Sequence, residues 1–114
     1  MTISEKRFSQ GVVMSINGRF ESGAAPVALA ELERLTETSS PCFVFDCSAM
    51  HYVSSAGLQA ILQIAKKVKS RHKAQVAAVG LDPLVHEIFK VSGVSAMLVF
   101  YPTLAEIPLG DLVH

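Results

Sequence analysis

The sequence of residues 42–58, CFVFDCSAMHYVSSAGL, decides the fold. Its first six residues are almost wholly apolar, which is typical of a central strand covered on both faces. Ser54 or Ser55 then supplies the cap of a helix. Apolar residues recur along that helix at the i, i+3, i+4 and i+7 positions, namely Leu58, Ile61, Leu62, Ala65 and Val68. A buried strand that leads through a loop into such a helix indicates an α/β fold.

The rest of the chain extends this alternation in both directions. Residues 3–8 and 12–16 predict a hairpin around the turn 9–11, and residues 22 to about 38 predict a one-sided helix. After the quoted stretch we expect a strand at 74–79, a helix capped by Asp82 and ended by Gly93, a strand at 97–101 and a short terminal helix at 102–107. The pattern predicts one α/β domain over residues 1–114. Its sheet is mixed and mostly parallel, with about five strands, an antiparallel N-terminal hairpin and about four helices.

The composition argues against several classes of protein. Half of the 114 residues are hydrophobic, which suffices for one core without a metal or a disulfide. Ten basic residues balance ten acidic ones, so the chain lacks the basic face that nucleic-acid binding needs. Residues 1–10 lack a secretory signal, and no apolar run approaches the roughly 18 residues of a membrane-spanning helix. We therefore expect no nucleic-acid partner and no membrane insertion.

The two cysteines, Cys42 and Cys47, lie in one predicted strand. Five residues of strand separate them by roughly 16 Å, whereas a disulfide needs Cα atoms within roughly 7 Å of each other. We therefore expect two free thiols, a reducing compartment and a cytoplasmic location.

The usual catalytic arrangements are missing from the sequence. It has neither of the glycine-rich loops that hold nucleotides, and Ser54 is not in a G-x-S-x-G elbow. The histidines are scattered without the spacing of metal ligands, at His51, His72, His86 and His114. Basic residues from Lys66 to Lys73 fall at a helix C-terminus, where they complement the helix dipole rather than form a docking surface. We expect a protein that is not an enzyme and has no metal or cofactor.

The turn that leads into the helix after Val53 is the best candidate for a functional site. Ligands and partners of α/β sheets are received beyond the carboxyl ends of strands. The start of a helix offers unpaired N–H groups and a positive dipole end, so a phosphate on a serine there would be tolerated. Gly57 weakens the first turn by about 1 kcal/mol relative to alanine, which suggests the close approach of another backbone. The residues alone leave two interpretations open: both serines are only caps, or one is a switch.

These residues resemble the STAS family, the small domains typified by bacterial anti-sigma factor antagonists. The resemblance lies in residues 43–46, FVFD, and 52–58, YVSSAGL, and continues in 18–21, GRFE, and 89–94, FKVSGV. It implies a STAS-like domain over almost the whole chain. It also implies that partner kinases phosphorylate Ser55, that Ser54 stands where the family often has aspartate, and that Asp46 organises the loop as a hydrogen-bond acceptor.

The function implied by the resemblance is that of a phosphorylation-switched protein-interaction module. The unphosphorylated chain would bind and sequester a kinase-type anti-sigma factor or related regulator, and phosphorylation would prevent this. The implied partners are a serine-protein kinase of the histidine-kinase-like ATPase type and a PP2C-type serine phosphatase. The predicted partner contacts are Glu21, Met50, His51, Ser54, Ser55, Gly57, Leu58 and Gln59.

Two other functions stay open at this point. One is a constitutive accessory subunit of a lipid transport ATPase, because some STAS-like domains of such transporters carry a similar Ala-Gly-Leu at the helix start. The other is a sensor that binds a nucleotide or another small molecule, as some members of the family do.

Overall fold

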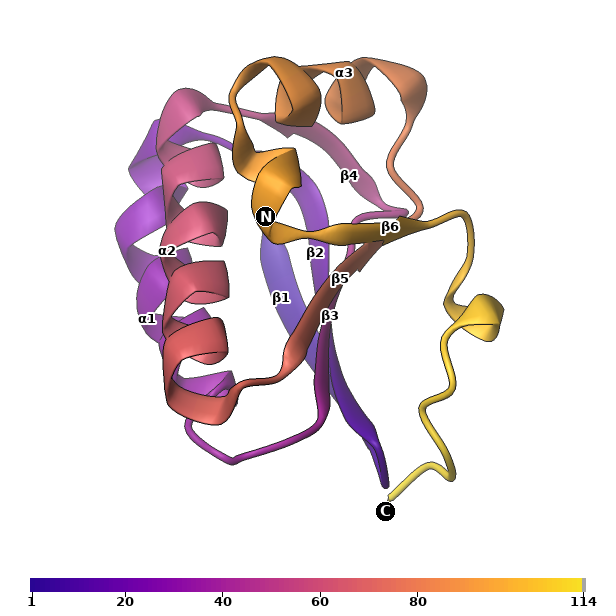
Figure 1. Ribbon diagram of the computed structural model, residues 1–114. Helices are drawn as coiled ribbons and strands as arrows, with labels where there is room; N and C mark the ends of the chain where they lie inside the picture. The colour runs from indigo at the N-terminus through magenta and orange to yellow at the C-terminus, as the bar shows by residue number, and fades with distance from the viewer. Residues whose placement is uncertain (114) are drawn as a thin grey trace.

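The computed structural model describes residues 1–113, so that His114 lies outside the described residues (Figure 1). Its strands are β1 Thr2–Phe8, β2 Gly11–Phe20, β3 Cys42–Asp46, β4 Met50–Val53, β5 Gln75–Val79 and β6 Val99–Tyr101. Its α-helices are α1 Ala25–Leu35, α2 Ser55–His72 and α3 Pro83–Val91. Three short 3-10 turns complete the list: η1 Ser22–Ala24, η2 Val94–Met97 and η3 Leu104–Glu106.

The strands form one mixed sheet in the order β1-β2-β3-β5-β6, with β4 paired to β2. β1 and β2 make an antiparallel hairpin at one edge. The pairs β2–β3, β2–β4, β3–β5 and β5–β6 are all parallel. The predicted α/β class, the antiparallel hairpin and the mostly parallel sheet are therefore confirmed.

Strand β4 and the second half of β2 were not predicted from the sequence. β2 continues to Phe20 instead of ending near residue 16, and its last residues pair with β4. β4 has only four residues, buried at both ends and exposed between. It therefore shows neither the alternation nor the apolar run by which a strand is recognised. Its pairing fixes the segment before α2 to the sheet, which matters for the site described below.

The first predicted helix is shorter than expected at both ends. Residues 22–24 form a 3-10 turn, and α1 begins at Ala25 with Pro26 in its first turn. Proline suits that position because its missing N–H would have no partner in the helix. The helix ends at Leu35 rather than near residue 38.

The predictions for the C-terminal third of the chain were correct for α3 and partly wrong beyond it. The Asp82 carboxylate accepts a hydrogen bond from Val85 N at 2.9 Å, and Gly93 follows the helix at φ +82°. The expected terminal helix at 102–107 is only the 3-10 turn η3. Thr103 and Glu106 form a capping box at the start of this turn. The fold thus has three α-helices and six strands among its described residues, instead of about four and about five.

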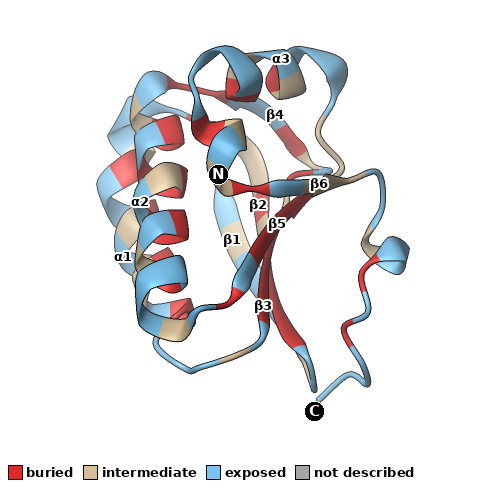
Figure 2. Ribbon diagram, viewed as in Figure 1, coloured by how far each residue is buried: buried red, intermediate tan, exposed pale blue. Residues whose placement is uncertain are grey.

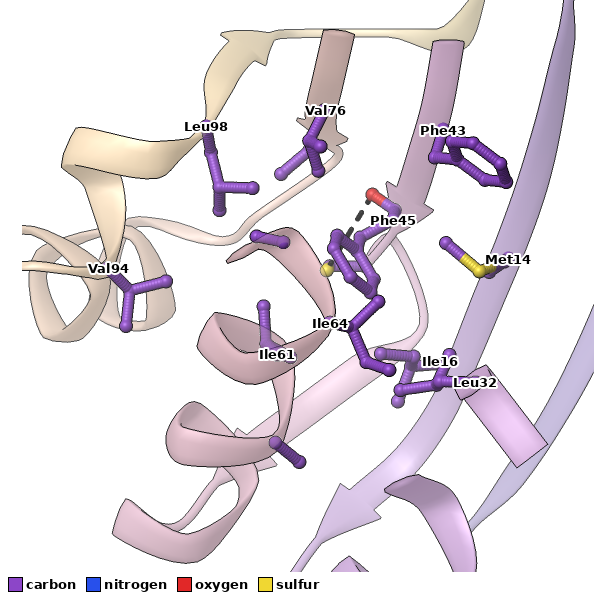
Figure 3. Packing of buried hydrophobic residues seen from close by; sticks show 14 of the residues in the cluster. Met14, Ile16, Leu32, Phe43, Phe45, Ile61, Ile64, Val76, Val94 and Leu98 are labelled. Carbon is purple, nitrogen blue, oxygen red and sulfur yellow. Dashed lines mark hydrogen bonds between the residues drawn. The ribbon is translucent and has the colours of Figure 1, made fainter. Parts of the chain in front are cut away.

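Both faces of the sheet are covered (Figure 1, Figure 2). On one face α1 and α2 pack against a core in which Ile61 and Ile64 of α2 lie near Phe45 (Figure 3). On the other face the segment after β6 contributes Ile107 and Leu109 to a second, smaller cluster. β3 is consequently buried on both faces, as its apolar sequence predicts. α3 lies beyond the carboxyl ends of the parallel strands, at the same end of the sheet as the start of α2 (Figure 1).

Candidate functional site

The start of α2 is anchored to the end of β2 through Ser54. Its backbone N–H donates to Phe20 O at 2.9 Å, and its Oγ accepts a hydrogen bond from Gly57 N at 3.1 Å. The extended backbone of Ser54, with φ −84° and ψ 169°, is the geometry of a helix N-cap. Only 8% of Ser54 is exposed. Of the two serines, Ser54 is therefore the cap.

Ser55 occupies a different environment, although it is the next residue. It is the first residue of the 18-residue helix α2, and it is exposed. The positive end of the helix dipole lies at this position. Within the described residues, the first turn of α2 contains no acidic side chain that would offset this positive potential. The hydroxyl of Ser55 thus lies at the surface in a place that favours negative charge.

Gly57 is explained by packing inside the chain and not by the approach of another backbone. A Cβ atom at this position would lie 2.9 Å from Cδ1 and Cγ of Phe20 and 3.0 Å from Cγ2 of Val53. Such distances are below normal carbon contacts, so a larger residue would displace the Phe20 ring. The expectation that another backbone approaches Gly57 is corrected accordingly. Gly57 lets the helix start sit directly on the ends of β2 and β4.

A bulge in β4 turns two adjacent side chains toward solvent. Gly18 of β2 lies opposite Met50 and Arg19 lies opposite Tyr52, so His51 is an extra residue in the pairing. His51 and Tyr52 are both exposed as a result, whereas Met50 is buried. Bulges of this kind are common next to functional sites because they redirect side chains.

Arg19 and Tyr52 form part of the site and were missed in the sequence. The Arg19 guanidinium carbon lies 4.5 Å from the centre of the Tyr52 ring, and Arg19 Nε is 2.9 Å from Glu21 Oε1. Both charged side chains are well exposed, so their ion pair contributes little to stability. The pair instead holds the Tyr52 ring and the Glu21 carboxylate at the surface. No sequence pattern indicated these two residues, because only the pairing of β4 with β2 brings them together.

We call the exposed side chains around this helix start the α2-start surface. Its members come from the end of β2, from β4 and from the first two turns of α2, where Gln59 lies one turn beyond Ser55. The turn η1 packs against α2 and keeps the chain after Glu21 close to them. The surface comprises Arg19, Glu21, His51, Tyr52, Ser55 and Gln59.

Half of the predicted partner contacts lie on this surface and half do not. Glu21, His51, Ser55 and Gln59 are exposed. The other four are buried: Met50, Ser54, Gly57 and Leu58. Because these four residues are buried, the structure does not support the prediction that they contact a partner directly. Leu58 belongs to the apolar stripe of α2 that faces the sheet, and Met50 points into the same core.

The loop between β3 and β4 is held by Asp46. Asp46 Oδ1 accepts hydrogen bonds from Ser48 N at 3.0 Å and from Ser48 Oγ at 2.7 Å. Cys47 N donates to Val79 O at 2.9 Å, which ties the loop to the end of β5. Gly80, at φ +72°, lets the chain pass the Ser48 backbone, since a Cβ there would lie 2.9 Å from Ser48 Cα. These contacts fix the direction in which β4 leaves the loop.

The cysteines are placed in the interior, away from the α2-start surface. Both are free and buried. Burial raises the pKa of both thiols, and for Cys47 burial, together with the nearby Asp46 charge, raises it to about 12. A thiol with such a pKa stays protonated at neutral pH and is a poor nucleophile.

Across residues 1–113, no three His, Cys, Asp or Glu side chains converge in a group that could hold a metal ion. Within that range no helix has the length and apolar character needed to span a bilayer.

Comparison with known proteins places this fold and site in context. The family model described as the STAS domain matches residues 4–107. A candidate anti-sigma factor antagonist of Bordetella bronchiseptica, BtrV, is 27% identical over 93 residues, which cover 82% of this chain and 79% of BtrV.

Solved structures share the same architecture. An anti-sigma factor antagonist from Mycobacterium paratuberculosis superposes with a TM-score of 0.81 at 22% identity, over 92% of this chain and 88% of the other. The anti-sigma factor antagonist SpoIIAA in its unphosphorylated form gives 0.76 at 14% identity, over 92% and 91%. The phosphorylated form of SpoIIAA, from Bacillus, gives 0.70 at 13% identity, over 92% and 95%. At these identities the likeness establishes a shared fold.

Proposed function

The chain belongs to the STAS domain family, and from this premise we propose that it is an anti-sigma factor antagonist switched by phosphorylation of Ser55. In its unphosphorylated state it binds and sequesters a kinase-type anti-sigma factor of the histidine-kinase-like ATPase type. The observation that carries the proposal is the contrast between two adjacent serines. Ser54 is buried and caps α2, whereas Ser55 is exposed at the positive end of that helix.

The position of Ser55 suits a reversible phosphate. A kinase would transfer the γ-phosphoryl group of ATP to Ser55 Oγ, which gives up its proton, and ADP would leave. The new group carries about −1.5 to −2 charges at neutral pH. At the N-terminus of α2 this charge meets the dipole favourably, and residues 55–58 of the described chain add no opposing carboxylate. The fold therefore tolerates both states, and a PP2C-type phosphatase would restore the hydroxyl.

The same charge is sufficient to end binding. A charge left unpaired in a desolvated protein interface weakens binding by about 2–5 kcal/mol, and each 1.4 kcal/mol is about tenfold in affinity. No refolding is needed, because the Ser54 cap and the Phe20–Ser54 hydrogen bond do not involve the Ser55 hydroxyl. The switch is thus a local change of charge on a preformed surface.

The relatives support this assignment. BtrV is named as a candidate anti-sigma factor antagonist and aligns over most of this chain. SpoIIAA has been solved both without and with its phosphate, and both forms superpose on this chain. A protein of this fold therefore keeps its architecture when phosphorylated. Among the predicted contacts, we propose that the exposed ones, Glu21, His51, Ser55 and Gln59, touch the partner, together with Arg19 and Tyr52.

The experiment that tests the proposal is a phosphorylation assay with site mapping. The chain is incubated with ATP and, in turn, each purified histidine-kinase-like anti-sigma factor of its source organism, and peptides are analysed by mass spectrometry. We expect one phosphate, located at Ser55, and no incorporation into Ser55→Ala. Ser54→Thr retains a capping hydroxyl and serves as the matched control, which should still be phosphorylated. Phosphate at Ser54, or none with any kinase of the panel, would overturn the proposal.

A further inference from the structure

The basic residues of the chain are concentrated at the C-terminal end of α2. Residues 66–73 contain five of the ten lysines and arginines and no aspartate or glutamate, so this segment has a formal charge of +5. The rest of the chain, with five basic and ten acidic residues, has a formal charge of −5. The net charge of zero therefore conceals two regions of opposite sign.

Most of the basic side chains in this segment have no carboxylate partner. Elsewhere in the chain, four of the five basic side chains form ion pairs with glutamates. In the segment only Lys67 does so, with its Nζ 2.9 Å from Glu33 Oε1. Within residues 1–113 the other four form no ion pair, and all four are exposed. We call them the α2-end patch: Lys66, Lys69, Arg71 and Lys73.

The helix dipole accounts for only part of this patch. Its negative end attracts cations in the last turn of α2, which contains Lys69 and Arg71. Lys66 precedes that turn and lies three residues before Lys69, so two like charges are neighbours on one side of the helix and repel each other. An anionic partner would relieve this repulsion. The interpretation that these residues only complement the dipole is therefore incomplete.

The chain around the patch lacks what a specific protein or nucleic-acid interface requires. Stable protein interfaces contain desolvated apolar anchors, but none of the exposed large hydrophobic side chains of residues 1–113 lies on α2. Single-stranded nucleic acids are held by stacking on aromatic side chains, and residues 66–73 contain no phenylalanine, tyrosine or tryptophan. Four cations neutralise few phosphates, so the affinity of the patch for a DNA duplex would be low.

An anionic lipid bilayer requires neither apolar anchors nor aromatic stacking. Its headgroups present a plane of negative charge without fixed geometry, and clusters of about four to eight lysines and arginines on an amphipathic helix are typical of segments that bind it. Each basic residue near such a surface strengthens binding about fivefold. The charge of the α2-end patch is thus complementary to a bilayer surface.

We propose that the α2-end patch binds an anionic bilayer, such as one that contains phosphatidylglycerol, while the chain stays outside the hydrocarbon core. The inference is independent of the proposed function. α2 starts at the end of the molecule where α3 lies and finishes at the other (Figure 1). Its 18 residues separate the two ends by about 25 Å, well beyond the Debye length of about 8 Å at physiological ionic strength. Ser55 therefore stays accessible on a membrane-bound chain, and its phosphate would leave lipid binding unchanged.

The test is sedimentation of the purified chain with vesicles that contain phosphatidylglycerol and phosphatidylcholine in equal parts, and with vesicles of phosphatidylcholine alone. We expect the chain to bind the first kind only, and binding to weaken as salt is added, because salt screens the charges. The variant Lys66→Gln/Lys69→Gln/Lys73→Gln removes three charges of the patch and should bind about a hundredfold more weakly.

The matched control, Lys6→Gln/Arg34→Gln/Lys90→Gln, removes the same charge at exposed positions outside α2. It should bind the vesicles like the wild-type chain, and unchanged far-UV circular dichroism shows that both variants fold. Equal binding by the two variants, or no binding of the wild-type chain to the phosphatidylglycerol vesicles, would overturn the inference. Binding of the patch to duplex DNA in place of the vesicles would assign another partner and overturn it as well. A failure of Ser55 phosphorylation would remove the proposed function but leave the vesicle result as it stands.

Discussion

The difference between the two serines at the start of α2 can be measured as a difference in stability. Ser54→Ala removes the acceptor of Gly57 N–H, and Gly57 is itself buried. Loss of an N-cap costs about 0.5–2 kcal/mol, and an unsatisfied buried donor costs about 1–3 kcal/mol. We therefore expect the free energy of unfolding to fall by about 1–2 kcal/mol. For a chain of 114 residues, an unfolding entropy of about 2.1 cal/mol/K per residue converts this to a Tm lower by about 4–8 °C.

The matched variants isolate the cap. Ser55→Ala leaves the Ser54–Gly57 hydrogen bond intact and changes an exposed side chain, so its free energy of unfolding should stay within about 0.5 kcal/mol of the wild-type value. Ser54→Asp retains a capping acceptor and should lie closer to wild type than Ser54→Ala. Urea unfolding followed by far-UV circular dichroism gives these differences from the midpoints at constant m. Equal losses in Ser54→Ala and Ser55→Ala would refute the assignment of the cap to Ser54.

Two further predictions concern the packing beneath the site. Gly57→Ala gains about 1 kcal/mol of helix propensity but forces a Cβ within 2.9 Å of the Phe20 ring, which costs about 1–3 kcal/mol. We expect a net loss in urea unfolding relative to Gly23→Ala, where nothing lies within 4 Å of the added atom; a stabilised Gly57→Ala would contradict the packing argument. Burial raises the pKa of Cys47 to about 12 in the folded chain, so the folded chain holds the thiol proton more tightly than the unfolded chain does. The stability gained in this way is complete below the unfolded pKa near 8.5 and is lost as the pH rises toward 12. Within that window Cys47 alone should lower the free energy of unfolding by about 1.4 kcal/mol per pH unit, and Cys47→Ala should remove this part of the slope; an unchanged slope would show that Cys47 does not cause it.

The sequence predicted the parts of the fold that rest on strong local patterns. β3 was recognisable because its run from Cys42 is almost wholly apolar, and α2 because its apolar residues repeat at helical spacing. β4 was not recognisable from the sequence, because its four residues, exposed in the middle and buried at both ends, match neither the alternation of a strand nor the spacing of a helix. The pairing of β4 with β2 is a contact between residues about thirty positions apart in the sequence, and local propensity carries no information about it.

The candidate site was located from the sequence, but its surface was not. The cap motif and the family resemblance both point to the two serines, and the structure separates their environments. Leu58 belongs to the apolar repeat of α2, which already indicates that it is buried, although its place in the motif suggested a partner contact. Burial of Met50 depends on how β4 packs on the sheet, which its position in the motif does not reveal. Arg19 and Tyr52 meet only through the unpredicted strand pair. Proximity in the motif was thus a poor guide to exposure.

The central claim is that the state of the Ser55 hydroxyl decides whether a partner binds. It is tested most directly by the affinities of Ser55→Ala and Ser55→Asp for the kinase that phosphorylates the chain, measured side by side by titration calorimetry. The account predicts that Ser55→Ala binds like the unphosphorylated chain and that Ser55→Asp binds at least about tenfold more weakly. Equal affinities of the two variants would contradict it and would instead fit a constitutive subunit.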